Sequence, residues 1–267
     1  MTSRNAQLKY LLAAVPTVPL LPILYMQGMR IRRTMPQLPP AAQPSGKVKI
    51  NSDHPPRRLL FLGESTVAGV GVKTHAEGFA GTLAKTLAET WQTEIEWRVY
   101  AQNGYTARLV RERLVPQAAK EQADWIIVGL GGNDAFGCNS PLRWRRELQA
   151  LIEELRRTFP NTPIAFTNMP PIKLFPAFTP LMKQTIGNLV ELLGDTLEEL
   201  VQNYPQVYYN AERIQLAAWE QRHGVSGRVE DYFSDGVHPS LLTYQVWARD
   251  MAQFVAVQEL TSVVEQS

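Results

Sequence analysis

The sequence predicts an α/β fold, with a sheet of five parallel strands covered by helices on both faces. The first observation is a pair of continuous apolar runs, RLLFLG at 58–63 and DWIIVGL at 124–130. Such runs are typical of strands that are buried on both faces of a parallel sheet. The second observation is the alternation of such runs with helical stretches, which favours a sheet with two helical layers. Because crossovers in these sheets are right-handed, all strands should end at one edge, where ligands bind.

The predicted elements follow one another without an internal repeat. Apolar runs predict strands at 58–63, 95–101, 124–130, 163–168 and 206–210. Helical stretches are expected at 77–92, 106–122, 141–158, 179–203 and 240–258. The helix at 141–158 has the clearest periodicity, and Pro141 suits its first turn because no backbone donor is needed there.

Composition and charge narrow the class of protein. Hydrophobic residues make up 45% of the 267 residues and charged residues 19%, which is enough apolar material for a packed core. The net charge of +2 argues against a dedicated nucleic-acid binder, which usually carries a basic face. Cys138 is the single cysteine, so no disulfide can form within the chain, and the four histidines show no zinc-site spacing. We therefore expect no metal and no nucleic-acid partner.

An apolar segment at 1–33 contains an uncharged stretch, residues 10–29. A stretch of this length is just sufficient to cross a hydrocarbon core of about 30 Å as a helix. Three prolines weaken that prediction because each removes a backbone donor: Pro16, Pro19 and Pro22. We favour an uncleaved membrane anchor, and an apolar arm packed on the domain is a close alternative. A signal peptide is disfavoured because no A-x-A site follows the stretch closely.

Positive charges flank the apolar stretch on both sides: Arg4 and Lys9 before it, and Arg30, Arg32 and Arg33 after it. By the positive-inside rule, they favour a membrane-associated protein whose catalytic domain is cytoplasmic, by a margin of one charge. Six prolines among small and polar residues then predict an extended linker at 34–56. The folded domain is expected at 57–267.

Four short polar clusters follow predicted strands or precede the last helix. They are Gly63-Glu64-Ser65-Thr66, Asn103-Gly104-Tyr105-Thr106, Gly131-Gly132-Asn133-Asp134 and Asp235-Gly236-Val237-His238-Pro239-Ser240. Each cluster alone has a simpler interpretation: the serine as a helix cap, the glycines as turns, the histidine as a solvated residue. The G-x-S-x-G elbow of α/β-hydrolases and the spacing of a phosphate-binding loop are both absent.

Together the four clusters predict a catalytic serine site at the sheet edge. Ser65 follows a strand and can present its hydroxyl there. Asp235 lies three residues before His238, so its carboxylate can accept from one imidazole nitrogen and leave the other as a base. The Ser65 and Gly104 backbone N–H groups and the Asn133 amide can donate to an oxyanion. The remaining histidines lack such partners and are expected at the surface: His54, His75 and His223.

The series GEST, NGYT, GGND and DGVHP resembles the four sequence blocks of the SGNH/GDSL hydrolases. In this resemblance the family's nucleophile falls on Ser65, its oxyanion glycine on Gly104 and its oxyanion asparagine on Asn133. The acid and the base fall on Asp235 and His238. The resemblance implies a flavodoxin-like three-layer α/β/α sandwich and a mechanism that needs no cofactor.

The resemblance covers roughly residues 57–260, and two positions depart from the family pattern. Glu64 stands where the family usually has Asp, and Thr66 where it usually has Leu. The serine itself is retained, so these departures bear on substrate rather than on activity. Members of the family include esterases, lipases, thioesterases, lysophospholipases and carbohydrate acetylesterases.

The predicted reaction is hydrolysis of a carboxylic ester, with a small-molecule or lipid ester as the substrate. The apolar loop at 169–178 follows the fourth strand, and its Phe175 and Phe178 are predicted to line an acyl pocket. An equally good interpretation is that these rings cap the core. With the apolar N-terminus, the loop favours a short- or medium-chain or lipid-like acyl group. Acyl transfer to an alcohol, carbohydrate deacetylation and a non-catalytic membrane-tethered binding module are the alternatives.

Overall fold

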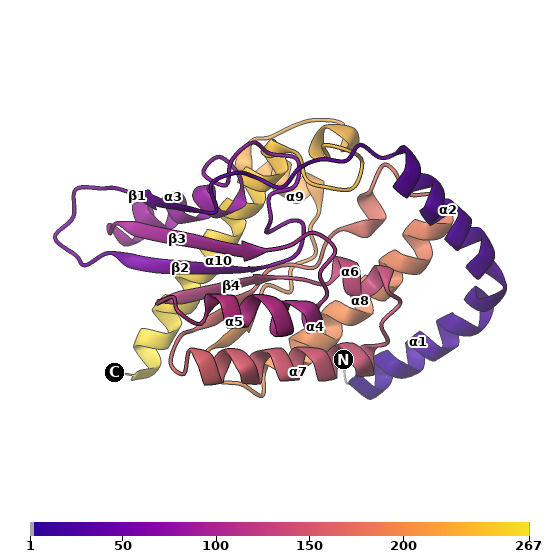
Figure 1. The fold of residues 1–267 in the computed structure, drawn as a ribbon, viewed down its shortest axis with the longest axis horizontal. Coiled ribbons are helices and arrows are strands. Elements are labelled where there is room, and N and C mark those ends of the chain that lie inside the picture. Colours follow the sequence, from indigo (N-terminus) through magenta and orange to yellow (C-terminus); the bar gives the residue numbers. More distant parts are fainter. Residues whose placement is uncertain (1–2, 267) are drawn as a thin grey trace.

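The computed structural model describes residues 3–266 and contains a six-stranded mixed sheet between two layers of helices (Figure 1). The strands are β1 (Ser45–Val48), β2 (Arg57–Gly63), β3 (Ile95–Ala101), β4 (Trp125–Gly129), β5 (Ile164–Phe166) and β6 (Val207–Tyr209). Their order in the sheet is β1-β3-β2-β4-β5-β6, and every pair from β3 to β6 is parallel. The predicted α/β sandwich and its five parallel strands are therefore confirmed. All of β4 is buried, as its continuous apolar run predicted.

The sixth strand, β1, lies inside the segment that was predicted to be a linker. It pairs antiparallel with β3 at the edge of the sheet, in a register that places Ser45 opposite Arg98. Just before it, the Ala41 N–H donates to the Ala68 carbonyl at 2.9 Å. The structure thus differs from the linker prediction, because the chain from residue 41 to 48 is docked on the domain. No sequence pattern indicates this strand, because the pairing uses backbone groups of only four residues, SGKV.

Helices cover the two faces of the sheet unequally. One face carries α3 (Phe79–Trp91) and α10 (Leu241–Gln266), which pack on each other. The other face carries α4 (Ala107–Leu109), η2 (Val110–Leu114), α5 (Val115–Ala118), α7 (Pro141–Thr158) and α8 (Pro180–Val201). Shorter helices occupy the connections: α6 (Gly132–Phe136), η3 (Ile172–Leu174), α9 (Leu216–His223) and η4 (Val229–Tyr232).

The predicted helix at 106–122 is shorter and irregular in the structure. Its middle part, η2, is a π-helical turn, and regular helix ends at Ala118. Pro116 explains this irregularity, because proline has no N–H to donate and its ring crowds the preceding turn. The segment still covers its face of the sheet, since Val110, Leu114 and Val115 are buried.

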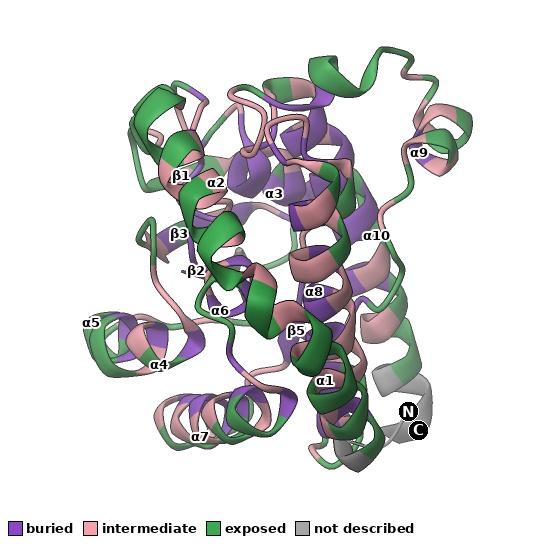
Figure 2. Cartoon of the chain, turned by 90° about the vertical axis from the view of Figure 1, so that its right-hand side faces the viewer, coloured by how far each residue is buried: buried purple, intermediate pink, exposed green. Residues whose placement is uncertain are grey.

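The N-terminal residues form an arch over the edge at which the parallel strands end (Figure 1). The arch (residues 3–34) consists of α1 (Ser3–Thr17), η1 (Val18–Leu20) and α2 (Leu21–Thr34). The helical stretch Asn5–Thr34 is long and apolar enough to cross a membrane, with a mean hydropathy of 1.5, a property that N-terminal signal sequences share. In the structure α1 packs on α7 and α8, while the outer side of the arch is exposed (Figure 2).

Candidate active site

Ser65 lies two residues beyond β2, at the edge where the parallel strands end. The chain turns there, and the Ala68 N–H donates to the Glu64 carbonyl at 2.9 Å. The tight end of β2 requires glycine, because a Cβ at Gly63 would lie 2.3 Å from the Gly129 carbonyl oxygen. This close approach of β2 and β4 fixes the position from which Ser65 is presented.

The loop before α10 holds Asp235 against His238. His238 Nδ1 lies 2.7 Å from Asp235 Oδ2, and the His238 N–H donates to Asp235 Oδ1 at 2.8 Å. The Asp235 side chain is 1% exposed and that of His238 12%. Burial alone would raise the pKa of Asp235, but the hydrogen bonds from His238 and from the Val237 N–H hold this pKa below its usual range. An ionised carboxylate at this distance favours the tautomer with its proton on Nδ1, so Nε2 can accept a proton.

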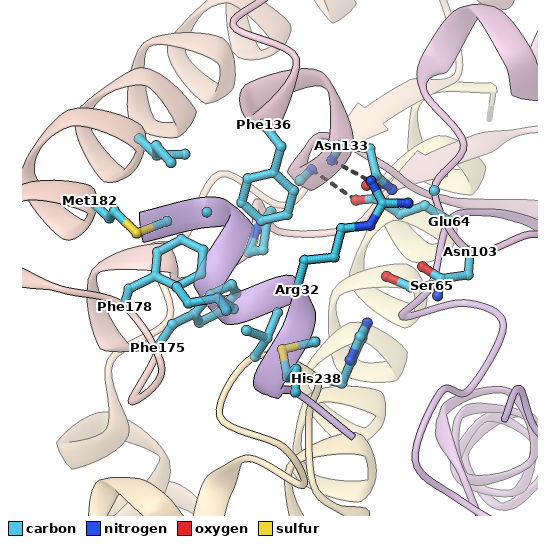
Figure 3. Close-up of a pocket in the computed structure, with 18 of the residues that line it drawn as sticks. Arg32, Glu64, Ser65, Asn103, Asn133, Phe136, Phe175, Phe178, Met182 and His238 are labelled. Carbon is cyan, nitrogen blue, oxygen red and sulfur yellow. Dashed lines mark hydrogen bonds between the residues drawn. The ribbon is translucent and has the colours of Figure 1, made fainter. Parts of the chain in front are cut away.

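The structure brings the four predicted clusters together around one cavity of about 950 Å³. Ser65, Gly104, Asn133 and His238 all line it, and Ser65 and His238 lie at the same end of it (Figure 3). Within the described part of the chain, no residue accepts a hydrogen bond from the Ser65 or Gly104 N–H. Gly104 has φ +85°, a left-handed conformation that glycine adopts without strain. Both backbone groups are thus available to an oxygen atom of a ligand.

Asn133, the third candidate oxyanion donor, is held in place by Glu64. Its Nδ2 donates to Glu64 Oε2 and, at 3.2 Å, to the Tyr105 carbonyl oxygen. The Asn133 N–H donates to Glu64 Oε2 at 3.0 Å, and the Gly132 N–H to Glu64 Oε1 at 2.8 Å. To accept a hydrogen bond from Asn133 Nδ2, a substrate oxygen must therefore share this donor with the Tyr105 carbonyl or displace that carbonyl as its acceptor.

Glu64 is buried, and burial raises the pKa of its carboxyl to about 7, against the opposing effect of the N–H groups of Asn133 and Gly132. The sequence identified this residue only as a departure from the family pattern. In the structure its carboxylate spans from the serine loop to the loop after β4, so Glu64 positions the Asn133 amide.

Replacing Glu64 with glutamine should lower kcat for ester hydrolysis by about tenfold to a hundredfold. Glutamine has an NH2 group in place of one carboxylate oxygen, and this group cannot accept hydrogen bonds from Gly132 or Asn133. The acid limb of the kcat/KM profile should be steeper in the wild type, where the ionisation of Glu64 contributes to it, than in Glu64→Gln. Glu64→Asp, which keeps the charge, is the matched control and should retain the steep limb. Profiles of the same steepness in all three proteins would contradict this role.

Ionisation of Glu64 should also affect folding. Because its folded pKa of about 7 lies above the ordinary value of 4.5, its stabilising contribution is complete below pH 4.5 and is lost as the pH rises through 7. Thermal unfolding of the wild type should therefore show a loss of Tm across this range, and Glu64→Gln should remove that part of the pH dependence.

Asp134 joins the loop after β3 to the loop after β4. Its fully buried carboxylate accepts from the Ala107 N–H at 3.0 Å and from Asn139 Nδ2 at 2.7 Å. Burial raises the pKa of Asp134 to about 6. No sequence pattern assigned Asp134 a role of its own, although its position directly after Asn133 was an available signal. It fixes the segment that carries Gly104 relative to α6.

Phe175 and Phe178 are buried and also line the cavity. Their positions are therefore consistent both with rings that cap the core and with rings that line a pocket. Their rings contact edge to face, with centroids 5.3 Å apart, and the Phe136 ring lies 5.9 Å from that of Phe178. The loop is tied to the loop of the histidine, because the Ala177 N–H donates to the Gly236 carbonyl at 3.1 Å.

One wall of the cavity is α2, which the sequence analysis did not connect with the active site. Leu24, Met29 and Arg32 are among the residues that α2 contributes. Figure 3 shows Arg32 extending from α2 towards Glu64 and Asn133. No local pattern could have predicted this contact, since it joins segments that are distant in the sequence.

Two of the other histidines are not at the surface, contrary to expectation. His223 Nε2 lies 2.6 Å from Asp250 Oδ1, and both side chains are buried. His75 is also buried, which lowers its pKa to about 4. The acid partner of His223 was missed because it lies 27 positions away, on α10.

Comparisons with known proteins agree with this architecture. The model of the GDSL-like lipase/acylhydrolase family matches residues 61–246. The solved structure of TesA has a TM-score of 0.54 and 20% identity, over 73% of this chain and 94% of that chain. The lipase Lip_vut3 from a goat rumen metagenome has a TM-score of 0.52 and 19% identity, over 73% and 95%. A family 3 carbohydrate esterase from Clostridium thermocellum has a TM-score of 0.52 and 15% identity, over 76% and 100%.

A search of curated protein sequences found no match. The fold and the matched family together define an ester hydrolase built on an α/β/α sandwich. The chain belongs to the GDSL-like lipase/acylhydrolase family, whose model spans more than half of its length. The resemblance inferred from the four sequence clusters is thereby confirmed.

Proposed function

We propose that the protein hydrolyses carboxylic esters with short- or medium-chain or lipid-like acyl groups, through an acyl-enzyme on Ser65. The observation that carries the proposal is the cavity of about 950 Å³, within the range of small-molecule sites. Ser65 and His238 lie at one end of it, and Phe175 and Phe178 lie towards the other (Figure 3). Asp235 is paired with His238 at 2.7 Å.

In the proposed mechanism His238 Nε2 takes the proton of the Ser65 hydroxyl as its oxygen attacks the ester carbonyl. Asp235 keeps the imidazole oriented and stabilises its charged form. The Ser65 and Gly104 N–H groups and the Asn133 amide donate to the oxyanion. Each donor lowers the activation free energy by about 3 kcal/mol. His238 then gives its proton to the leaving alcohol. Water repeats the sequence on the acyl-enzyme, releasing the acid and restoring Ser65.

The lining of the cavity supports an acyl chain as the group that occupies its far end. Phe136, Phe175, Phe178, Met182 and Ile186 contribute apolar side chains there. A sugar would need polar partners along the same wall. We therefore propose carboxylic esters with apolar acyl groups rather than carbohydrate acetates.

We also propose that residues 10–29 associate the protein with a membrane and that the catalytic domain is cytoplasmic. The length and hydropathy of the N-terminal helical stretch support the association. The positive charges on both sides of the stretch, with one more after it than before it, favour the cytoplasmic side, because that leaflet carries anionic lipids.

Hydrolysis of a series of p-nitrophenyl esters, from acetate to palmitate, tests the proposed activity. We expect saturable hydrolysis with an optimum of chain length, and rapid inactivation by a fluorophosphonate. An enzyme that cleaves none of these esters and keeps no bound phosphonate would contradict the proposed function.

Phe178→Leu should change chain-length preference if Phe178 contacts the acyl group. The smaller side chain should raise the ratio of kcat/KM for long over short esters by about tenfold, the usual effect of a few methylene groups in an apolar pocket. Phe233→Leu is the matched control, because Phe233 is buried to the same 8% exposure but does not line the cavity. Equal shifts in both variants would show a general loosening of the core instead.

A further inference from the structure

We propose that the outer side of the arch binds the surface of a lipid bilayer with anionic headgroups, and that the acyl chain of a membrane lipid ester passes from the bilayer into the Ser65 cavity along α2. The inference rests on the proposed function and names its substrate class: acyl esters that reside in a membrane. Four features of the arch and of the cavity carry it.

The first feature is that the inner side of the arch is docked on the catalytic domain. The Tyr10 hydroxyl donates to the Cys138 carbonyl at 3.1 Å, and the Thr179 hydroxyl donates to Gln27 Oε1 at 2.8 Å. Ala6 is fully buried against the domain. Both helices of the arch are thus tied to the domain, and only their outer side is left to meet a partner.

The second feature is the apolar outer side. Of the fifteen large hydrophobic side chains that are exposed among the described residues, nine belong to the arch, at 43–74% exposure. They are Leu8, Leu11, Leu12, Val15, Val18, Leu21, Ile23, Tyr25 and Met26. A continuous patch of this kind marks a surface that binds a membrane or a protein. Figure 2 shows this exposed side running along both α1 and α2.

The third feature is charge, which favours an anionic membrane over a protein partner. The first acidic residue in the sequence is Asp53, and the preceding 52 residues carry seven Lys and Arg. Lys9 near one end of the arch and Arg30 and Arg33 near the other are exposed. Apolar helices with cations at their margins are typical of segments that lie in the headgroup region of anionic bilayers.

The bend of the arch fits the same interfacial position. Pro16, Pro19 and Pro22 interrupt the backbone hydrogen bonding there, and η1 joins the two helices. Carbonyl groups freed by proline are costly in the hydrocarbon core but can bond to water among the headgroups. A docked and bent arch in the plane of the membrane meets this requirement better than a single spanning helix.

The fourth feature is that the apolar patch and the cavity share residues. Leu21, Tyr25 and Phe136 line the cavity and are also 41–70% exposed. Leu24 and Met29, also on α2, line the same cavity as Ser65. An acyl chain can therefore move from the bilayer to the reaction centre along apolar side chains, without transfer through water.

Sedimentation with vesicles tests the bilayer surface. We expect the full-length enzyme to bind phosphatidylcholine vesicles with about one quarter phosphatidylglycerol at least about tenfold more tightly than pure phosphatidylcholine vesicles. The double variant Leu12→Glu/Val15→Glu, which changes exposed residues outside the cavity, should bind the anionic vesicles at least about tenfold more weakly. Val257→Glu/Leu260→Glu on α10 is the matched control, with similar exposure, and should bind as the wild type does.

Activity assays then separate this inference from the proposed function. Leu12→Glu/Val15→Glu should hydrolyse soluble p-nitrophenyl acetate at the wild-type rate but lose about tenfold or more of its activity on a long-chain ester held in the anionic vesicles. Equal activity of all three proteins on the vesicle ester would overturn the inference while leaving the hydrolase intact. A wild type that binds no vesicles, and whose dimer becomes monomeric in Leu12→Glu/Val15→Glu, would assign the patch to a second copy of the chain.

A cross-link tests whether the arch stays docked when it is bound. Cys138 is the single cysteine, so Tyr10→Cys creates one pair for a short bismaleimide. We expect the same intramolecular cross-link in solution and on vesicles, and none in the otherwise identical protein with Tyr25→Cys in place of Tyr10→Cys. Loss of the cross-link on vesicles would show that α1 leaves the domain, which contradicts an arch that lies in the plane of the membrane.

Discussion

Replacing Ser65 with alanine should lower kcat/KM for ester hydrolysis by about ten-thousandfold or more, because removal of a catalytic nucleophile disables the whole triad. The fold should not change, since Ser65 is half-exposed at a turn and its side chain forms no hydrogen bond with another described residue. Activity on p-nitrophenyl esters and the thermal unfolding temperature are the two measurements. Any residual rate reflects the oxyanion donors and the cavity alone.

The neighbouring hydroxyl provides the control for this experiment. Thr66 also lines the cavity, and the family usually has leucine at this position, so Thr66→Ala should change kcat/KM only slightly. A large loss in Thr66→Ala together with a small loss in Ser65→Ala would move the nucleophile to the threonine and contradict the proposed mechanism.

Asp235→Asn should reduce kcat by about a thousandfold to ten-thousandfold, through the histidine rather than through the substrate. The carboxylate accepts from His238 Nδ1 and from the backbone N–H groups of Val237 and His238. An asparagine amide group must face either the ring or those N–H groups. In the first case it donates to Nδ1 and places the imidazole proton on Nε2, where it prevents base catalysis.

The ionisation of Asp235 also affects folding and has its own control residue. Since hydrogen bonds lower the pKa of Asp235, its carboxylate stabilises the folded protein above the ordinary pKa of 3.8, and this stabilisation is lost as the pH falls. Asp231→Asn changes an exposed acid near the same loop and should leave kcat unchanged. A loss in Asp235→Asn no larger than that in Asp231→Asn would show that Asp235 does not orient the histidine.

Features that depend on local sequence were predictable. The strands β2 and β4 appeared as continuous apolar runs, and the chemistry-bearing residues Ser65, Asn133 and His238 followed predicted strands or preceded the last helix. A parallel sheet gathers such positions at one edge, so their convergence followed from topology alone. The three-residue spacing of Asp235 and His238 allowed the contact that the structure shows at 2.7 Å.

Features that depend on contacts between distant segments were not predictable. The strand β1 pairs through backbone groups, and its four residues, SGKV, are too few to show a strand pattern. The docking of α2 over the cavity joins residues near 30 to residues 65, 133 and 238. Glu64 looked like a conservative replacement, yet its carboxylate accepts hydrogen bonds from Gly132 and Asn133, which are distant in the sequence. In each case the contact depends on tertiary packing and not on the secondary-structure propensity of the local sequence.

The most direct test of the central claim is to locate the covalent adduct of a fluorophosphonate by peptide mass spectrometry. The proposed mechanism predicts one phosphonate per chain, on Ser65, with no adduct in Ser65→Ala and slow labelling in Asp235→Asn. An adduct on another residue, or equal labelling of the wild type and Ser65→Ala, would contradict the assignment of Ser65 as the nucleophile.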